Sequence, residues 1–219
     1  MTDNIATVKR DIHHIQRVKD VLYQLPGTTS ETLNAGVTYI GQMFAHEIVG
    51  SKARRIKRSP KINMESLYGA NIDDYLDDLG RFICGKSVRC NGNELRNSDL
   101  PVDSALSKVN IADKRNDENI FISQLHLLWM KLHNKMLERL NGNVSDNIIK
   151  VKDDIEKLFK IIVIEELLNK VVRPEIIEGY RQVKDPSQLL LNGVDLKVVP
   201  TFFSVAVGRF GHSCLACSS

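Results

Sequence analysis

The sequence is poor in the features that would place it in a specialised class. Aromatic residues make up 6% of its 219 residues, and the net charge is no more than +3. A charge this small gives no basis for a nucleic-acid-binding surface. No apolar run approaches the roughly 20 residues of a membrane helix, because Lys160 and Glu165 enclose the run at 161–164. We therefore expect neither a nucleic-acid partner nor a membrane span.

Cysteine is also scarce, and no export signal is visible. Four cysteines in a chain of this length do not make a disulfide framework, so a reducing compartment is the default. The first residues, MTDNIATVKRDIHH, are charged and unlike a signal peptide. We expect a cytoplasmic protein with secretion as the alternative. The ordinary balance of 42% hydrophobic and 26% charged residues favours one soluble domain over 1–219.

Helical periodicity dominates wherever a pattern is clear. Four segments show apolar residues spaced by three and four: 7–25, 31–49, 118–140 and 147–172. The expected buried stripes are Leu125, Leu128, Trp129, Leu132, Met136 and Leu140 on the third, and Val151, Ile155, Leu158, Ile162 and Val163 on the fourth. Pro174 should end the fourth helix.

The remaining stretches predict loops. Glycines and prolines interrupt 51–117, whose basic run at 51–58 we expect to be solvated, and 180–200 resembles a second loop. The apolar stretch at 201–210 is typical of the start of a buried helix. The expected fold class is mainly α, in one compact unit.

The histidines separate into three kinds. His13 and His14 lie on a polar helix, which predicts surface positions. His126 and His133 are seven residues apart and share a helical face, where core histidines with satisfied hydrogen bonds are the usual finding. His46 and His212 remain as candidates for chemistry.

Gln42 and His46 form the most suggestive pair. They are four residues apart, so the amide and the imidazole project from the same face of the 31–49 helix. An imidazole can move protons near neutral pH. Glu47 points about 100° away and cannot serve the same pocket.

Four short segments, in order, carry a family resemblance. They are GVTYIGQMFAHEIV at 36–49, RSPKINMESLYG at 58–69, the stretch 99–137 containing DKRNDENIFISQLH, and VVPTFFSVAVGRFGHS at 198–213. Over 36–213 the chain resembles the animal-type haem peroxidases, particularly their bacterial branch. The resemblance implies that family's helical fold and the reduction of hydrogen peroxide with one-electron oxidation of a small donor.

The resemblance also assigns roles to residues. His212 would be the proximal ligand of a b-type haem iron. On the opposite face, His46 would take a proton from peroxide and return it to the departing oxygen. Arg115 would stabilise negative charge there, and Gln42 would hydrogen-bond ligand or water. From the sequence alone, Arg115 could instead cap or salt-bridge the 118–140 helix.

Two further family features are weaker in this chain. Family members often attach haem through esters to an Asp and a Glu; Glu118 matches the second, but Ala45 occupies the first position, so at most one ester can form. A family calcium site would use Glu47, Ser59, Asn63 and Glu65. Asn63 and Glu47 each replace an aspartate, which weakens the expected site.

Three alternatives remain open. A fatty-acid dioxygenase of the same superfamily needs a tyrosine where Arg209 stands, which disfavours that reading. The family domain extends well beyond the proximal histidine, so the domain is expected to be truncated after 213. It could be an inactive remnant or a binding protein whose exposed apolar surface drives self-association.

The third alternative is a zinc or redox site at Cys214-x-x-Cys217, with His212 or the Cys84 and Cys90 pair. No strand or knuckle pattern surrounds either cysteine pair. Residues 214–219 are also unlike the sequence that follows the proximal histidine in the family. We interpret these residues as a tail that no longer follows the family's reading frame, as the result of a frameshift or an early stop.

Overall fold

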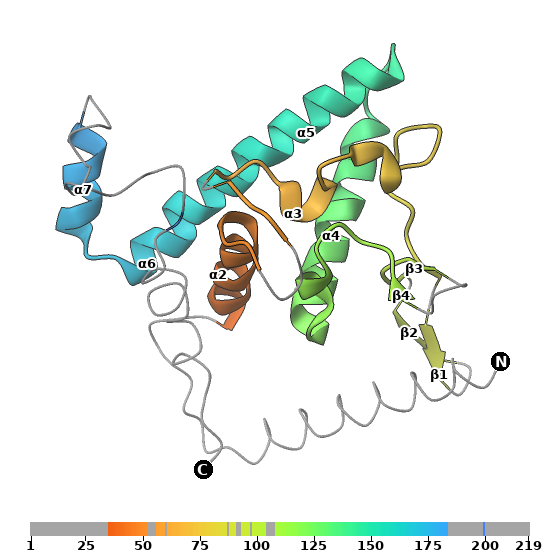
Figure 1. Cartoon of the computed structure of the whole chain (residues 1–219), viewed down its shortest axis with the longest axis horizontal. Coiled ribbons are helices and arrows are strands. Elements are labelled where there is room, and N and C mark those ends of the chain that lie inside the picture. The colour runs from red at the N-terminus through yellow and green to blue at the C-terminus, as the bar shows by residue number, and fades with distance from the viewer. Residues whose placement is uncertain are drawn as a thin grey trace.

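Three long helices set the shape of the protein in the computed structural model, which describes residues 35–51, 56–59, 61–86, 88–90, 93–96, 98–103, 108–183 and 199. They are α2 (Ala35–Ile48), α4 (Ile120–Leu137) and α5 (Val144–Ile161). Figure 1 shows α5 running obliquely above α2 and α4, from the upper right of the view down to α6 at the left. The described chain is mostly helical, which confirms the expected mainly-α fold class.

Helix α2 packs between two neighbours, and this arrangement positions the site. On one side it contacts α4, and on the other it contacts η3 (Ile162–Leu168), a π-helical continuation of α5. A last turn, α6 (Asn169–Val171), ends this long helical run. π-Helical stretches are rare and interrupt the regular α-helical ladder, so the helix expected over 147–172 is continuous but not uniform.

Asparagine side chains fix where α4 and α5, the longest helices in the described ranges, begin. Asn119 Oδ1 accepts the backbone N–H groups of Phe121 and Ile122 at 3.1 and 3.0 Å, so α4 starts at Ile120. Asn143 Oδ1 accepts the N–H of Asp146 at 3.2 Å and starts α5 at Val144. Such caps satisfy backbone donors that have no partner within the helix.

The described residues between α2 and α4 form only short elements, as the loop prediction for 51–117 requires. They comprise α3 (Glu65–Tyr68), η1 (Ile72–Asp74), η2 (Lys114–Asp117), and two antiparallel hairpins, β1 (Val88–Cys90) with β2 (Asn93–Arg96) and β3 (Val102–Asp103) with β4 (Lys108–Val109). Met64, just before α3, has φ 57°, a backbone conformation that residues other than glycine seldom adopt.

The core differs in detail from the predicted stripes. Leu128 is 61% exposed and Leu158 is 37% exposed, whereas Phe159 is buried. On α4 the buried face instead includes both His126 and His133. The prediction was wrong for the two leucines because apolar spacing alone does not show from which sides other elements cover a helix.

Proline 174 ends one helix and begins another. The run through α6 ends at Val171, and α7 (Pro174–Gln182) follows with proline in its first turn, where the missing N–H costs no hydrogen bond. The sequence predicted the stop but not α7. The helices expected over 7–25 and 201–210, and most of the loop expected over 180–200, lie outside the described residues.

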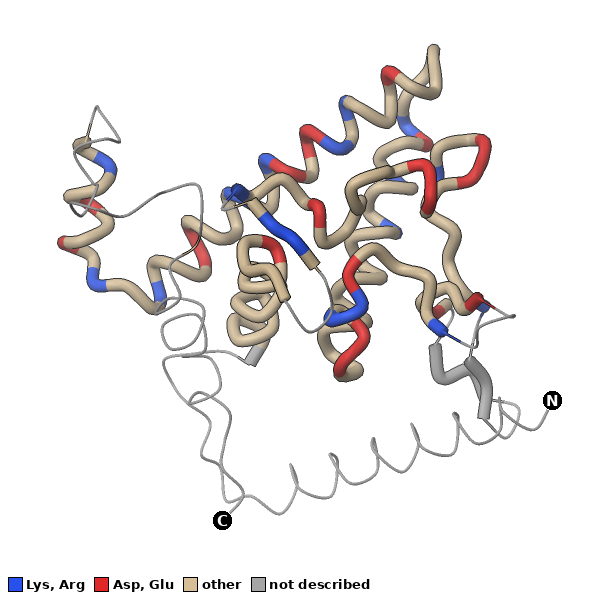
Figure 2. The backbone as a smooth tube through the Cα atoms, in the orientation of Figure 1, with Lys and Arg blue, Asp and Glu red and all other residues tan. Residues whose placement is uncertain are grey.

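Charged residues of both signs follow one another along α5 in Figure 2. The opposite face of that helix buries Val151, Ile155 and Phe159. Within the described ranges, no helix combines the length and apolarity needed to cross a membrane.

Candidate functional site

His46 lies in the last turn of α2 with 8% of its surface exposed. Its Nδ1 is 2.8 Å from Oδ1 of Asn116, a residue of η2 that is fully buried. An amide oxygen carries no hydrogen, so Nδ1–H must donate. The second ring nitrogen, Nε2, then holds the lone pair of the neutral imidazole.

Gln42 faces the same segment of the chain. Gln42 lies one turn of α2 before His46. Its Oε1 accepts a hydrogen bond from Asn119 Nδ2 at 3.4 Å. Both side chains therefore meet residues 116–119, and the prediction that they share one helical face is confirmed. The bond leaves the Gln42 amide nitrogen as a donor at this face.

The surroundings keep the His46 imidazole neutral. Burial lowers its pKa below the usual value, and the positive charge of Arg115 acts in the same direction. The hydrogen bond with Asn116 and the carboxylates of Asp113 and Glu118 oppose this, but the net pKa is lowered. A neutral imidazole can accept a proton at neutral pH.

Arg115 is placed against the backbone end of α2. Its Nη2 donates to the carbonyl oxygen of His46 at 2.7 Å and its Nη1 to that of Val49 at 2.8 Å. Carbonyls at a helix C-terminus lack partners within the helix, so the guanidinium acts as a cap there. Asn119, and not Arg115, caps the start of α4. The role of Arg115 toward peroxide stays a prediction.

The buried carboxylate of Asp113 forms ion pairs with two arginines, Arg58 and Arg115. Asp113 is fully buried and accepts from Arg115 Nη2 at 2.7 Å and from Arg58 Nη2 at 2.9 Å. Burial alone would raise the pKa of Asp113, but hydrogen bonds and charge from Arg115, together with the charge of Arg58, lower it. Arg58 also donates through Nε to the His46 carbonyl at 3.2 Å. The prediction of a solvated basic run over 51–58 was therefore wrong for Arg58, whose side chain is 9% exposed.

Glu47 points away from His46, as its angular offset predicted. The carboxylate is fully buried and accepts backbone N–H groups from Asn63, Glu65 and Ser66 at 3.2, 2.8 and 2.9 Å. Hydrogen-bonded to the backbone at the start of α3, Glu47 joins this turn to α2.

The residues expected to bind calcium gather in this turn but fit the cation poorly. Asn63 Nδ2 donates to Glu65 Oε1 at 2.8 Å, and both oxygens of Glu47 face N–H donors. In the described ranges, no hydrogen bond joins Ser59 to these residues, and no cluster of three His, Cys, Asp or Glu is suited to a metal. The calcium site stays a prediction.

Several predicted site residues have less structural context. Glu118 is exposed at the end of η2, close enough for its charge to act on His46. His212, Arg209, Cys214 and Cys217 lie outside the described residues. Cys84 is a half-buried free thiol.

The two core histidines are confirmed as such. His126 is 1% exposed and accepts at Nδ1 from Asn116 Nδ2 at 2.9 Å. His133 is fully buried: its Nε2 donates to the Gly80 carbonyl at 2.9 Å, so Nδ1 accepts from the Tyr68 hydroxyl at 3.0 Å. Every contacted ring nitrogen has a partner compatible with the neutral form.

Acid should destabilise the fold through His126. Burial lowers its pKa from 6.5 to about 4, so the unfolded chain binds a proton that the folded chain does not bind between those values. We expect the free energy of unfolding to fall by up to about 3 kcal/mol as pH decreases from 6.5 to 4. Urea unfolding across this range measures the loss, and His126→Gln should flatten it. Equal pH slopes in both proteins would contradict the assignment.

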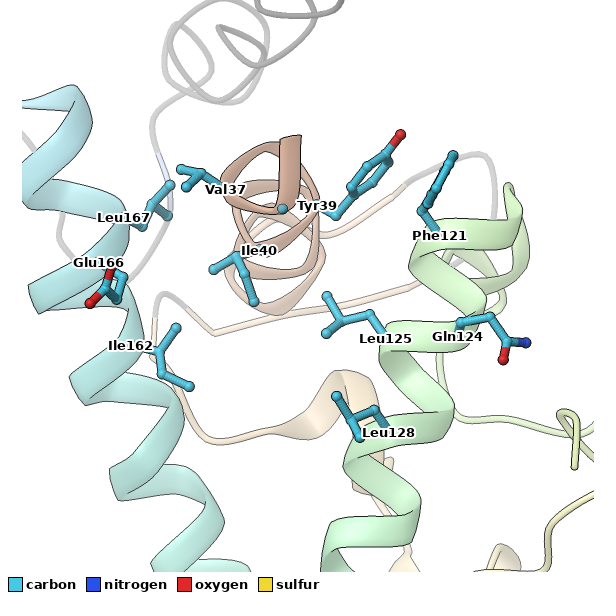
Figure 3. A pocket seen from close by; sticks show the side chains of 11 residues that line it. Val37, Tyr39, Ile40, Phe121, Gln124, Leu125, Leu128, Ile162, Glu166 and Leu167 are labelled. Carbon is cyan, nitrogen blue, oxygen red and sulfur yellow. The ribbon is translucent and has the colours of Figure 1, made fainter. Parts of the chain in front are cut away.

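A separate apolar groove lies between α2, α4 and η3 (Figure 3). Its volume is about 670 Å³. Side chains around it include Val37 and Ile40 of α2, Leu125 and Leu128 of α4, and Ile162 and Leu167 of η3. Neither Gln42 nor His46 lines it, so it is distinct from the histidine site. The self-association expected from exposed apolar surface stays a prediction.

Sequence reasoning missed the residues that support His46. Asn116 and Asp113 stand on either side of Arg115 in DKRNDEN, and Arg58 lies in the basic run. Closeness to Arg115 in the sequence was the only available signal for Asn116 and Asp113, and Arg58 had none, because the contacts of Asn116 and Arg58 with His46 span 70 and 12 residues.

Comparison with known proteins identifies the family. A family model described as "Animal haem peroxidase" matches residues 81–218, more than half of the chain, including Arg115, Glu118 and His212. The match does not reach Gln42 or His46, whose assignment rests on the resemblance at 36–49 and on geometry; the bacterial branch stays a prediction. Neither the curated proteins nor the solved structures gave a match. By its sequence match and its helical fold, the chain belongs to the animal haem peroxidase family.

Proposed function

We propose that this protein is a haem-dependent peroxidase that reduces hydrogen peroxide and oxidises a small-molecule donor by single electrons. Membership of the family suggests peroxidase-type function in general. The observation that carries the proposal is the buried, neutral imidazole of His46, whose Nδ1–H is held by Asn116 so that Nε2 accepts protons. A function in the response to oxidative stress would follow from this reaction.

The described residues fit the side of a b-type haem at which peroxide would bind. An imidazole with a free acceptor nitrogen and an amide donor lie on one face of α2, and an exposed carboxylate, Glu118, lies nearby. His212 would hold the haem iron, and Glu118 would form the single ester that Ala45 leaves available. When bound, haem supplies the iron that binds peroxide and the one-electron redox chemistry.

The chain's own groups would handle the protons and the charge. His46 Nε2 takes a proton from peroxide and later gives it to the departing oxygen, which requires the imidazole to be neutral at the outset. Gln42 donates from its amide nitrogen to the bound ligand or to water. Arg115, held at the end of α2, contributes positive charge close to His46.

Haem titration tests the proposal. We expect the purified chain to develop a Soret band, and His212→Ala to abolish or strongly shift it because the residue that would hold the iron is lost. Cys214→Ser is the matched control for the same tail and should leave the band unchanged. Folded wild-type protein without a Soret band would reject the proposal and favour a non-catalytic remnant. Stoichiometric zinc without haem would favour the cysteine site.

A further inference from the structure

Asn116 links the last turn of α2 to α4 through its side-chain amide. Its Oδ1 is 2.8 Å from His46 Nδ1, and its Nδ2 is 2.9 Å from His126 Nδ1. All three side chains are buried, with exposed fractions of 0% for Asn116, 8% for His46 and 1% for His126. The amide therefore contacts both rings away from bulk water.

The orientation of this amide is determined by a third contact. The carbonyl oxygen of Ser66 lies 3.5 Å from Asn116 Nδ2 and can only accept a hydrogen bond. Rotating the amide by 180° would place Oδ1 against that carbonyl, two acceptors facing each other. The NH₂ group must therefore face Ser66 and His126, and Oδ1 must face His46.

These directions fix the protons on both rings. His46 must carry its hydrogen on Nδ1 to donate to Oδ1, and His126 must have a bare Nδ1 to accept from Nδ2. The hydrogen of neutral His126 then sits on Nε2. One asparagine thus selects opposite tautomers in the two histidines.

We propose that Asn116 is a positioning residue that holds His46 in its Nδ1–H tautomer, leaving Nε2 as the only ring nitrogen able to accept the peroxide proton. His126 and Ser66 anchor the amide so that it cannot turn over. This inference rests on the proposed function for its catalytic meaning, but the tautomer exists in the chain without haem. Partners of this kind determine which nitrogen of a histidine is available for chemistry.

Nitrogen-15 NMR of histidine-labelled protein without haem tests the tautomers. In the wild type, long-range ¹H–¹⁵N correlations should show Nδ1–H on His46 and Nε2–H on His126. In Asn116→Ala, His46 should become a mixture of tautomers. The inference is overturned if wild-type His46 carries its hydrogen mainly on Nε2, or if Asn116→Ala leaves the His46 tautomer unchanged.

Asn116→Asp is the conservative variant that separates positioning from a general structural role. It keeps an oxygen for His46 but replaces the donor that faces His126. We expect His46 to remain Nδ1–H, because the carboxyl group still offers an oxygen to that ring nitrogen. If Asn116→Ala fails to fold, this variant carries the test, and loss of the Nδ1–H tautomer of His46 in Asn116→Asp would overturn the inference.

Kinetics of the haem-loaded protein complete the design. Asn116→Ala should slow the reaction with peroxide by about 10-fold or more, with the Soret band retained, and Asn116→Asp should recover most of the rate. Correct tautomers in a chain that binds no haem would uphold the positioning and reject the proposed function. If the wild-type protein reacts with peroxide and Asn116→Ala reacts at the same rate, the proposed function is upheld and the positioning role is rejected.

Discussion

Replacing Asp113 with asparagine should lower the free energy of unfolding by about 3–5 kcal/mol, the range for breaking a buried ion pair by removing one partner. The carboxylate is fully buried and is the shared counter-ion of Arg58 and Arg115, whose side chains are 9% and 10% exposed. Asparagine has nearly the same shape but no charge. Arg115 would then remain in the interior without its carboxylate partner, and Arg58 would keep only its longer contact with Glu65, at 3.9 Å.

The effect should reach α2 because the same arginines hold its C-terminal end. Arg58 and Arg115 both donate to the His46 carbonyl, at 3.2 and 2.7 Å. A loss of this size is a large share of a typical stability of about 5–15 kcal/mol. It corresponds to a melting temperature lower by about 10 °C for a chain of this length.

Urea and thermal unfolding measure the effect, and an exposed ion pair provides the control. Asp154 contacts Lys157 at 3.6 Å with side chains 42% and 71% exposed. Surface pairs of this kind contribute about 0–1 kcal/mol, so Asp154→Asn should leave stability nearly unchanged. Similar losses in the two variants would contradict a special role for Asp113.

Replacing His46 with glutamine should slow the reaction of the haem-loaded protein with peroxide by about 10²- to 10⁴-fold, the usual contribution of a positioned general acid–base group. Glutamine fills similar space but cannot carry a proton between the two peroxide oxygens. His212 is unaffected, so the Soret band and haem affinity should be retained. Stopped-flow spectroscopy of the Soret band after mixing with peroxide gives the rate.

Two further variants show whether the loss is specific to the imidazole. Gln42→Ala removes the other predicted group on the same face and should have a smaller effect, because an amide transfers no proton. Gln124→Ala alters a polar side chain that lines the apolar groove and should leave the rate unchanged. A His46→Gln protein that reacts with peroxide within about 3-fold of wild type would remove His46 from the mechanism.

The sequence predicted those parts of the site that depend on local spacing. The four-residue separation of Gln42 and His46 placed both on one face of α2, because a helix has a fixed number of residues per turn. The same argument directed Glu47 elsewhere, and the carboxylate does bind the turn before α3. Helical periodicity likewise predicted α2, α4 and α5, although asparagine caps shifted two of the starts by two or three residues.

The ion-pair and amide contacts could not be predicted in this way. Arg58 belonged to a basic run that composition assigns to solvent, yet its side chain is paired with Asp113, 55 residues away. Leu128 fits an apolar stripe but is 61% exposed, while His126 is buried on the same helix. Burial depends on which elements pack against a helix, and local spacing does not contain that information.

The sequence by itself determined the helical fold class, the family motifs and the pairing of Gln42 with His46, because these depend on residues close together in the chain. Only the tertiary structure decided that Asp113 neutralises two buried arginines and that Asn116 lies between His46 and His126. Those contacts join residues 2 to 70 positions apart through the packing of η2 against α2 and α4. The physical reason is that hydrogen-bond direction and desolvation arise only when separate elements meet, and together they set the proton positions on His46.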